Sequence, residues 1–278
     1  MIKVTTVMVA TLALMAYLFR DTLFQAPAAA PATFERLAAL PREVRESSGI
    51  VVLPQDGHYL THNDAGNRPY LYKLNEQGKL LQTYKLNLKN IDWEDLTMDD
   101  SGYIYIADTG NNDNDRRDLT IYKVNASNMS DTQPIRYTYE DQGKYPPKKK
   151  ERNFDVEAIF WHSGSLYLIS RDRGRRETAK VYRVPDTPGN HQAKLIGSHK
   201  LKAQVTGAAI SPDRQTVVLL SDEKLHLYTG FDAPAAFYEG TYEEVQLPGA
   251  GQTEGVAFEN DRTLIITSEG GNLYRYSR

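Results

Sequence analysis

Five short segments of the chain place an oxygen-bearing side chain at the same position of a repeated pattern. The segments cover residues 47–51, 93–97, 156–160, 205–209 and 253–257. Their second residues, called the channel residues below, are Ser48, Glu94, Glu157, Thr206 and Glu254. Three carboxylates and two hydroxyls, without histidine or cysteine, are ligands that Ca²⁺ prefers and that Zn²⁺ does not. The pattern therefore predicts a calcium site if the fold brings the five segments together.

The spacing of the channel residues predicts the fold. It is 46, 63, 49 and 48 residues along the chain, and each segment is followed by a second strand pattern and a third one containing tyrosine. Repeats of about 40–50 residues with about four strands each are typical of β-propeller blades. The longest interval contains an insertion at residues 141–153. We predict an all-β, five-bladed propeller, with six blades as the alternative.

The last repeat ends after its third strand. Residues 32–39, which precede the first repeat, can supply the missing outer strand and close the ring, so that no free sheet edge remains there. The propeller domain would then cover residues 33–278. Residues 25–32 are rich in Ala and Pro and are expected to form a linker.

The N-terminal residues 1–24 contain the strongest apolar run of the chain. Residues 4–19 carry no charge, Lys3 precedes them, and Arg20 and Asp21 follow. This run is short for a membrane span and long for a signal-peptide core, and the nearest Ala-x-Ala sequences lie about ten residues beyond it. We expect an uncleaved membrane-anchor helix in a bacterial inner membrane, with the propeller facing the periplasm. The alternative is a cleaved signal and a secreted periplasmic protein.

The channel residues would gather at one mouth of the propeller channel, because the innermost strand of each blade lines that channel. Two carboxylates about 5 Å apart repel by on the order of 3 kcal/mol at an effective dielectric constant of about 20. Either some of the three glutamates hold protons, or a hard cation lies among them. The alternative is that they accept backbone hydrogen bonds and only align the blades.

Loops on the same face carry further candidate groups. Asp64 and Asp108 could position a catalytic water molecule. Candidate ligand-binding side chains are the amides and guanidinium groups of Asn63, Asn111, Arg116, Arg171 and Arg173. Arginine forks suit phosphate or carboxylate, so a small anionic molecule is the expected partner. The alternative is that these charges pair with neighbouring carboxylates in solvated loops.

Composition narrows the range of functions. The chain has no cysteine, which excludes disulfides, thiolate metal sites and cysteine nucleophiles. Its formal net charge of −3 and the lack of aromatic residues among the basic ones give no reason to expect a nucleic-acid partner. There is no Gly-x-Ser-x-Gly sequence that would indicate a serine hydrolase.

Two family resemblances add to these expectations. The C-terminal segments at residues 253–258, 264–270 and 273–276, together with an N-terminal anchor, resemble the SdiA-regulated (YjiK-like) family. That resemblance implies a membrane-anchored periplasmic propeller. The order Ser-Glu-Glu-Thr-Glu of the channel residues is similar to the central calcium shell of the five-bladed calcium-activated nucleotidases (apyrases), with Thr206 where that family has Ser. Nucleotide-contacting segments of that family have no match elsewhere in the chain.

Two main hypotheses for the function follow. The first is a periplasmic binding propeller with a central Ca²⁺ that recognises an anionic small molecule or envelope ligand at the channel face. The second is a metal-dependent phosphoesterase or nucleotidase-like hydrolase that uses the same metal. A third, lactone or sugar-acid hydrolysis, requires an Asn/Asp/Glu metal shell that the channel residues do not supply.

Overall fold

Twenty β-strands and three short 3₁₀ helices make up the part of the chain that the computed structural model describes, residues 31–53 and 57–278. The helices are η1 (Arg42–Val44), η2 (Lys149–Glu151) and η3 (Pro234–Glu239). The predicted anchor, residues 1–24, and most of the predicted linker lie outside the described residues. Within residues 31–53 and 57–278, no helix is both long and apolar enough to cross a bilayer.

The strands form groups of four in which neighbours pair antiparallel. The first group contains β2 (Ser47–Val52), β3 (Tyr59–Asn63), β4 (Tyr70–Leu74) and β5 (Leu80–Lys85). The second contains β6 (Trp93–Met98), β7 (Tyr103–Asp108), β8 (Thr120–Asn125) and β9 (Asn128–Tyr139). The third contains β10 (Val156–His162), β11 (Ser165–Ser170), β12 (Thr178–Pro185) and β13 (Gly189–Lys200). The fourth contains β14 (Gly207–Ile210), β15 (Thr216–Ser221), β16 (Lys224–Thr229) and β17 (Thr241–Gln246).

The fifth group combines the two ends of the described chain. It contains β18 (Thr253–Asn260), β19 (Thr263–Ser268), β20 (Asn272–Ser277) and β1 (Thr33–Ala39). Strand β1 pairs antiparallel with β20, from Thr33 opposite Ser277 to Ala39 opposite Asn272. The predicted closure by the segment before the first repeat is therefore confirmed.

The second and third groups share one continuous sheet, which the sequence repeat does not predict. Strands β9 and β13 each have 12 residues, and they pair in parallel over residues 135–139 and 189–193. This pairing joins β6–β9 and β10–β13 into an eight-stranded sheet. The two outer strands thereby satisfy each other's backbone groups at an edge that would otherwise be open.

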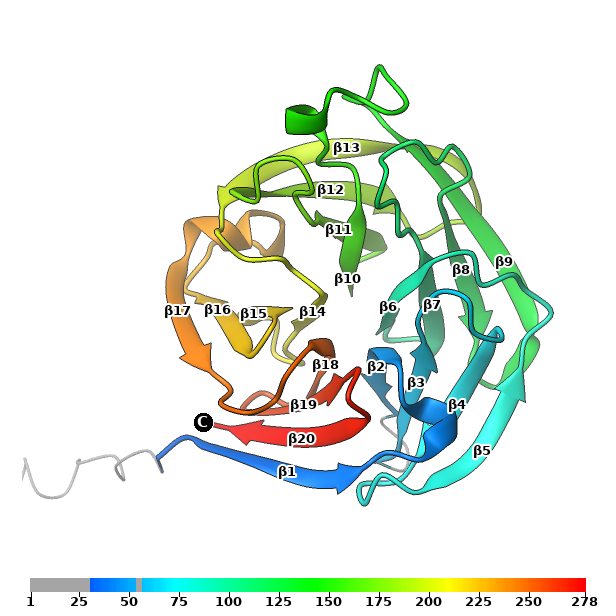
Figure 1. Ribbon diagram of the computed structural model, residues 1–278, viewed down its shortest axis with the longest axis vertical. Coiled ribbons are helices and arrows are strands. Elements are labelled where there is room, and N and C mark those ends of the chain that lie inside the picture. The colour runs from blue at the N-terminus through cyan, green and yellow to red at the C-terminus, as the bar shows by residue number, and fades with distance from the viewer. Residues whose placement is uncertain (1–30, 54–56) are drawn as a thin grey trace, which may run out of the picture. The chain divides into compact units, whose positions relative to one another are not determined.

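The innermost strands of the groups surround a common axis (Figure 1). Contacts run from β2 to β6, β10, β14 and β18 in order, and β18 also contacts β2. The residues that directly follow the channel residues are called the waist below; they are Gly49, Asp95, Ala158, Gly207 and Gly255. A Cβ atom at any of the three glycines would lie within 3.0 Å of the backbone of a neighbouring innermost strand. The carboxylate of Asp95 accepts hydrogen bonds there from the amides of Leu96, Ile159 and Ala208, and so links β6, β10 and β14.

An apolar cluster lies between each pair of neighbouring groups. Alternating residues of each strand point to opposite faces of the sheet, so a strand contributes to the clusters on both of its sides. Leu60, Leu71, Trp93 and Ile106 belong to the cluster between the first and second groups, for example. Burial of each such side chain contributes roughly 1.5–3 kcal/mol, and this sheet-on-sheet contact holds the inner strands in position.

The waist tolerates no added side chain at Gly49. A Cβ atom there would lie 2.5 Å from the backbone nitrogen of Leu96 and 2.8 Å from the backbone carbon of Asp95, and neither can move independently. We predict that Gly49→Ala lowers the free energy of unfolding by about 1–3 kcal/mol, measured by chemical denaturation. Gly143→Ala is the matched control, because nothing lies within 4 Å of its Cβ position. Equal stability of the two variants would contradict the close backbone contact.

Candidate cation site at the channel mouth

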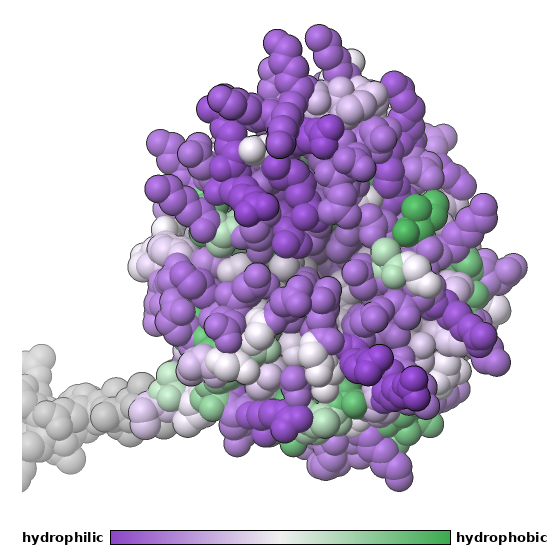
Figure 2. All heavy atoms as spheres, in the orientation of Figure 1, coloured by the Kyte–Doolittle hydropathy of each residue, from purple (hydrophilic) through white to green (hydrophobic). Residues whose placement is uncertain are grey.

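The predicted channel residues meet at one end of the axis. Ser48, Glu94, Glu157 and Glu254 lie at the second position of β2, β6, β10 and β18, and Thr206 directly precedes β14. All five are buried, with exposed fractions between 1% and 8%. The face of the molecule seen in Figure 2, in the orientation of Figure 1, is largely hydrophilic.

Breaks in strand register orient four of these side chains. The pairing of the innermost strand with its neighbour shifts between Ser47 and Ile50, and equivalent shifts occur at Glu94, Glu157 and Glu254. A β-bulge leaves a residue without a ladder partner and turns its side chain away from the regular alternation. The bulges therefore release the channel side chains from the sheet.

The two hydroxyls among the channel residues connect neighbouring strands. Ser48 Oγ donates a hydrogen bond of 2.6 Å to the backbone oxygen of Glu94, and Thr206 Oγ1 donates one of 2.7 Å to that of Thr253. Both hydroxyls thus link an innermost strand to the next one along the ring. Because their protons are used in these hydrogen bonds, the hydroxyls of Ser48 and Thr206 could bind an ion only through the lone pairs of their oxygens.

Two aspartates that the sequence analysis did not single out complete the acidic mouth. Asp92 and Asp155 each stand two residues before a channel glutamate. Carboxylate oxygens of Asp64, Asp92 and Glu94 lie within 4.8 Å of one another, as do those of Glu94, Asp155 and Glu157. The repeated Asp-x-Glu sequence at residues 92–94 and 155–157 is the signal that could have identified them.

Arginines neutralise only one of these two clusters. Arg171 Nη1 lies 2.8 Å from Glu157 Oε2, and Arg173 pairs with both Asp155 and Glu157. Arg171 and Arg173 were predicted to bind an anionic ligand, but in the structure their guanidinium groups are held by carboxylates of the chain itself. Glu157 consequently has cationic partners on both of its oxygens.

The other cluster, Asp64, Asp92 and Glu94, has no such partner. No arginine or lysine among the described residues lies within 4.0 Å of the Asp92 or Glu94 carboxylate. The Asp64 carboxylate accepts a hydrogen bond of 2.6 Å from the backbone amide of Ala65. Because Gly110 has no side chain, it leaves space for the carboxylates of Asp92 and Glu94. A Cβ atom at Gly110 would lie 2.0 Å from Glu94 Oε1 and 2.3 Å from Asp92 Oδ2, so any side chain there would displace the carboxylates.

Three further candidates from the sequence, Asp108, Asn111 and Arg116, form hydrogen bonds with one another or with the backbone next to the cluster. Asp108 Oδ1 accepts bonds from the Asp92 amide and from Arg116 Nη2, each 3.0 Å long, while its buried Oδ2 has no partner among the described residues. Asn111 Oδ1 accepts a hydrogen bond from the backbone amide of Arg116, and Asn111 Nδ2 donates one to the backbone oxygen of Phe154. The amide groups of Asn111 and the guanidinium group of Arg116 therefore stabilise the loop.

Burial and mutual repulsion favour the protonated forms of these acids. The pKa of Glu94 is raised well above its usual value, first by burial and then by Glu157, Asp155, Asp92 and Asp64. Burial also raises the pKa of Asp92 to about 6. For Glu254, burial and then Glu157 and Glu269 raise the pKa to about 9. A hard cation would remove this cost by stabilising the ionised carboxylates.

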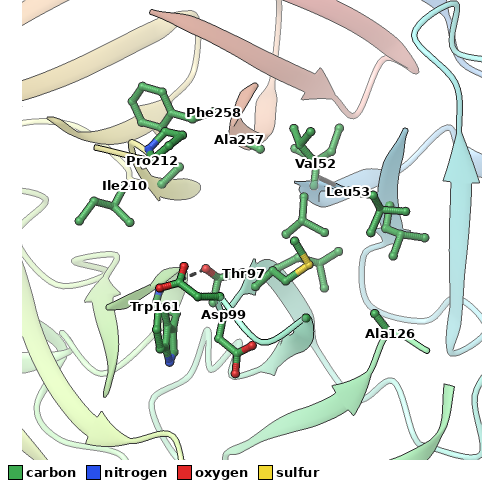
Figure 3. A pocket seen from close by; sticks show the side chains of 18 of the residues that line it. Val52, Leu53, Thr97, Asp99, Ala126, Trp161, Ile210, Pro212, Ala257 and Phe258 are labelled. Carbon is green, nitrogen blue, oxygen red and sulfur yellow. Dashed lines mark hydrogen bonds between the residues drawn. The ribbon is translucent and has the colours of Figure 1, made fainter. Parts of the chain in front are cut away.

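A separate cavity lies at the opposite end of the channel, beyond the waist (Figure 3). It has a volume of about 770 Å³, and its wall combines apolar residues such as Val52, Trp161 and Phe258 with polar ones such as Asp99 and Arg214. Asp99, at its edge, already accepts bonds from two backbone amides and from Tyr105 Oη. The cavity is thus chemically distinct from the acidic mouth and has none of the channel residues in its wall.

We predict that the protein without metal becomes less stable as the pH rises. An acid whose pKa is raised by folding holds more protons in the native state than in the unfolded state. The stability contributed by Glu254 is therefore complete below pH 4.5 and is lost as the pH rises through about 9. In the presence of a chelator, Glu254 alone should contribute a loss of up to about 1.4 kcal/mol per pH unit between pH 5 and 8, measured by unfolding at each pH. Glu254→Gln should reduce the change of the unfolding free energy with pH. A stability that stays constant or rises with pH would contradict the buried, acidic surroundings of Glu254.

Comparison with known proteins agrees with the fold. The solved structures that resemble the chain include the PQQ-bound aldose sugar dehydrogenase (Adh) of Streptomyces coelicolor, at 12% identity and a TM-score of 0.53, covering 91% of this chain and 99% of that one. A putative gluconolactonase matches at 14% identity and 0.52, covering 92% and 95%. A chain of a nidogen/laminin complex matches at 12% and 0.50, covering 80% and 72%. At such identities the likeness concerns the β-propeller fold alone.

The sequence itself matches one family. No curated protein matches it. The model of the family described as SdiA-regulated matches residues 39–277, which is most of the chain. This confirms the resemblance inferred from the C-terminal motifs. The chain therefore belongs to the SdiA-regulated family of β-propeller proteins.

Proposed function

We propose that the protein is a five-bladed propeller that binds Ca²⁺ at Asp64, Asp92 and Glu94 and uses the ion to hold an anionic ligand at the channel mouth. One observation carries this proposal: three carboxylates converge within 4.8 Å, and no guanidinium or ammonium group among the described residues pairs with Asp92 or Glu94. Isolated from a counter-ion, such a cluster is destabilised by repulsion and burial.

The donor set fits calcium better than other common metals. Ca²⁺ takes six to eight oxygen ligands in flexible geometry, whereas Zn²⁺ prefers nitrogen and sulfur and Mg²⁺ demands a strict octahedron. Three carboxylates provide part of this shell. Water or the oxygens of an anionic ligand would provide the rest, which explains how a face rich in acids could hold an anion.

Binding is better supported than phosphoester hydrolysis. A hydrolase would need cationic groups free to stabilise the charge that develops on phosphate. Arg116, Arg171 and Arg173, the arginines assigned to that role from the sequence, are each paired with carboxylates of the chain. Assay of the calcium-loaded protein with p-nitrophenyl phosphate tests this alternative directly.

We predict that the purified full chain binds one Ca²⁺ and that Glu94→Gln weakens binding at least about tenfold, because the variant loses one charged ligand. Isothermal titration calorimetry measures both. Glu243→Gln, at an exposed position of β17, is the matched control and should bind like the unmodified protein. Stoichiometric binding that is unchanged in Glu94→Gln, or no binding at all, would contradict the proposed site.

We also propose that residues 1–24 anchor the propeller to the inner membrane with the domain in the periplasm. The support is the uncharged run at residues 4–19 with Lys3 before it, followed by the Ala/Pro-rich residues 25–32. An anchor of this kind would keep the domain at the periplasmic surface of the inner membrane.

Removal of the anchor should change the location of the protein. We predict that the full chain sediments with the membrane fraction and is digested by protease added to spheroplasts. A variant in which residues 4–19 are replaced by the h-region and cleavage site of a cleavable signal peptide should be released as a soluble periplasmic protein. Recovery of the full chain in the soluble periplasmic fraction, with its N-terminus removed, would instead support the cleaved-signal alternative.

A further inference from the structure

A second cavity, on the first strand group, contains arginines that form no ion pair with a carboxylate among the described residues. It has a volume of about 430 Å³ and lies among η1, the loop between β3 and β4, and strands β4 and β5. Arg42, Arg45 and Arg68 line it. None of the three has a carboxylate partner within 4.0 Å among the described residues, in contrast to Arg116, Arg171 and Arg173.

Two of these arginines are held in place by contacts that leave their charge available. Arg45 lies against Gly271, where a Cβ atom would be 3.2 Å from Arg45 Cγ, and Gly271 has a φ of +70° that disfavours any larger residue. The guanidinium group of Arg68 lies 5.9 Å from the ring centre of Tyr70. Lys85 approaches the same ring at 5.9 Å and adds a further positive charge.

The cavity also offers acceptors for hydroxyl groups. Asn63 Oδ1 is buried and has no hydrogen-bond partner among the described residues, although its Nδ2 donates to the backbone oxygen of Glu43 at 2.7 Å. The carboxylates of Glu43 and Glu46 lie in the same wall. Carboxylates repel a bare polyanion but accept hydrogen bonds from hydroxyls. Tyr70, which is only partly buried, provides ring surface against which the apolar face of a sugar can lie.

The cavity adjoins the proposed cation site. Asn63, in its wall, is followed directly by Asp64 of the calcium cluster, and Asp64 donates its amide to the backbone oxygen of Glu46 at 3.0 Å. A ligand in the cavity would therefore be bound beside the ion. The arrangement combines guanidinium forks for an anion with acceptors for hydroxyls.

We propose that this cavity binds the anionic group and hydroxyls of an anionic sugar, which is a sugar carboxylate or a sugar phosphate. This inference rests on the proposed function, since it names the class of ligand that the channel face would recognise. Arg42, Arg45 and Arg68 bind the anion, and Glu43, Glu46 and Asn63 accept hydrogen bonds from the hydroxyls. None of these cavity arginines was identified from the sequence, because they lie outside the repeated loop positions.

The test is titration calorimetry of the purified full chain with glucuronate, glucose 6-phosphate and uncharged glucose, each with and without Ca²⁺. We expect one of the two anions to bind at least about tenfold more tightly than glucose. The preferred anion distinguishes carboxylate from phosphate recognition. Arg45→Gln and Arg68→Gln should each weaken that binding at least about tenfold. Arg262→Gln, at an exposed turn position, is the matched control.

Calcium titration of the same variants separates this inference from the proposed function. Arg45→Gln and Arg68→Gln should bind Ca²⁺ like the unmodified protein, since neither residue belongs to the calcium cluster. Unchanged sugar-anion binding in both arginine variants, or no preference for the anions over glucose, would overturn the cavity assignment even if Ca²⁺ binds. Arginine-dependent anion binding without any Ca²⁺ binding would support the cavity and overturn the proposed cation site.

Discussion

Repulsion among buried carboxylates at the start of the innermost strands is the constraint that shapes this molecule. The strands converge so closely that glycines form most of the waist, and the acids just above it are brought together by the same convergence. The protein compensates for this in two ways. Arg171 and Arg173 neutralise the Glu157 side, and Gly110 leaves space beside Asp92 and Glu94, which have no ion-pair partner within 4.0 Å among the described residues.

The fold makes such a site possible because each innermost strand is fixed independently of the mouth. Apolar clusters between neighbouring groups hold the strands from outside, and the Asp95 carboxylate ties three of them together at the waist. β-Bulges then free the channel residues from regular pairing. Rigid strands with locally released side chains are suited to holding an ion in a defined position. The positions of the acids at the mouth are therefore fixed by packing elsewhere.

Much of the fold could be predicted from the sequence, and less of the site. The repeat and the closing strand β1 follow from strand patterns that recur along the chain, because alternation and spacing are local properties. The parallel pairing of β9 with β13 depends on how far two outer strands extend, which no repeat encodes. Asp92 and Asp155 were missed although Asp-x-Glu recurs. The pairing of Arg171 and Arg173 with Glu157 depends on the conformations of long side chains, which spacing does not determine. The cavity around Arg45 likewise depends on how η1 packs against the β3–β4 loop and strands β4 and β5, which spacing does not determine.

Whether Asp64, Asp92 and Glu94 bind Ca²⁺ is tested most directly by a crystal structure of the protein grown with Ca²⁺, with the ion located by its anomalous scattering. We expect one ion with carboxylate oxygens of Asp64, Asp92 and Glu94 at about 2.3–2.6 Å. The ion pairs of Arg171 and Arg173 with Glu157 should remain. A mouth without an ion at millimolar Ca²⁺, or an ion at Glu157 with both arginines displaced, would contradict Ca²⁺ binding at the Asp64, Asp92 and Glu94 cluster.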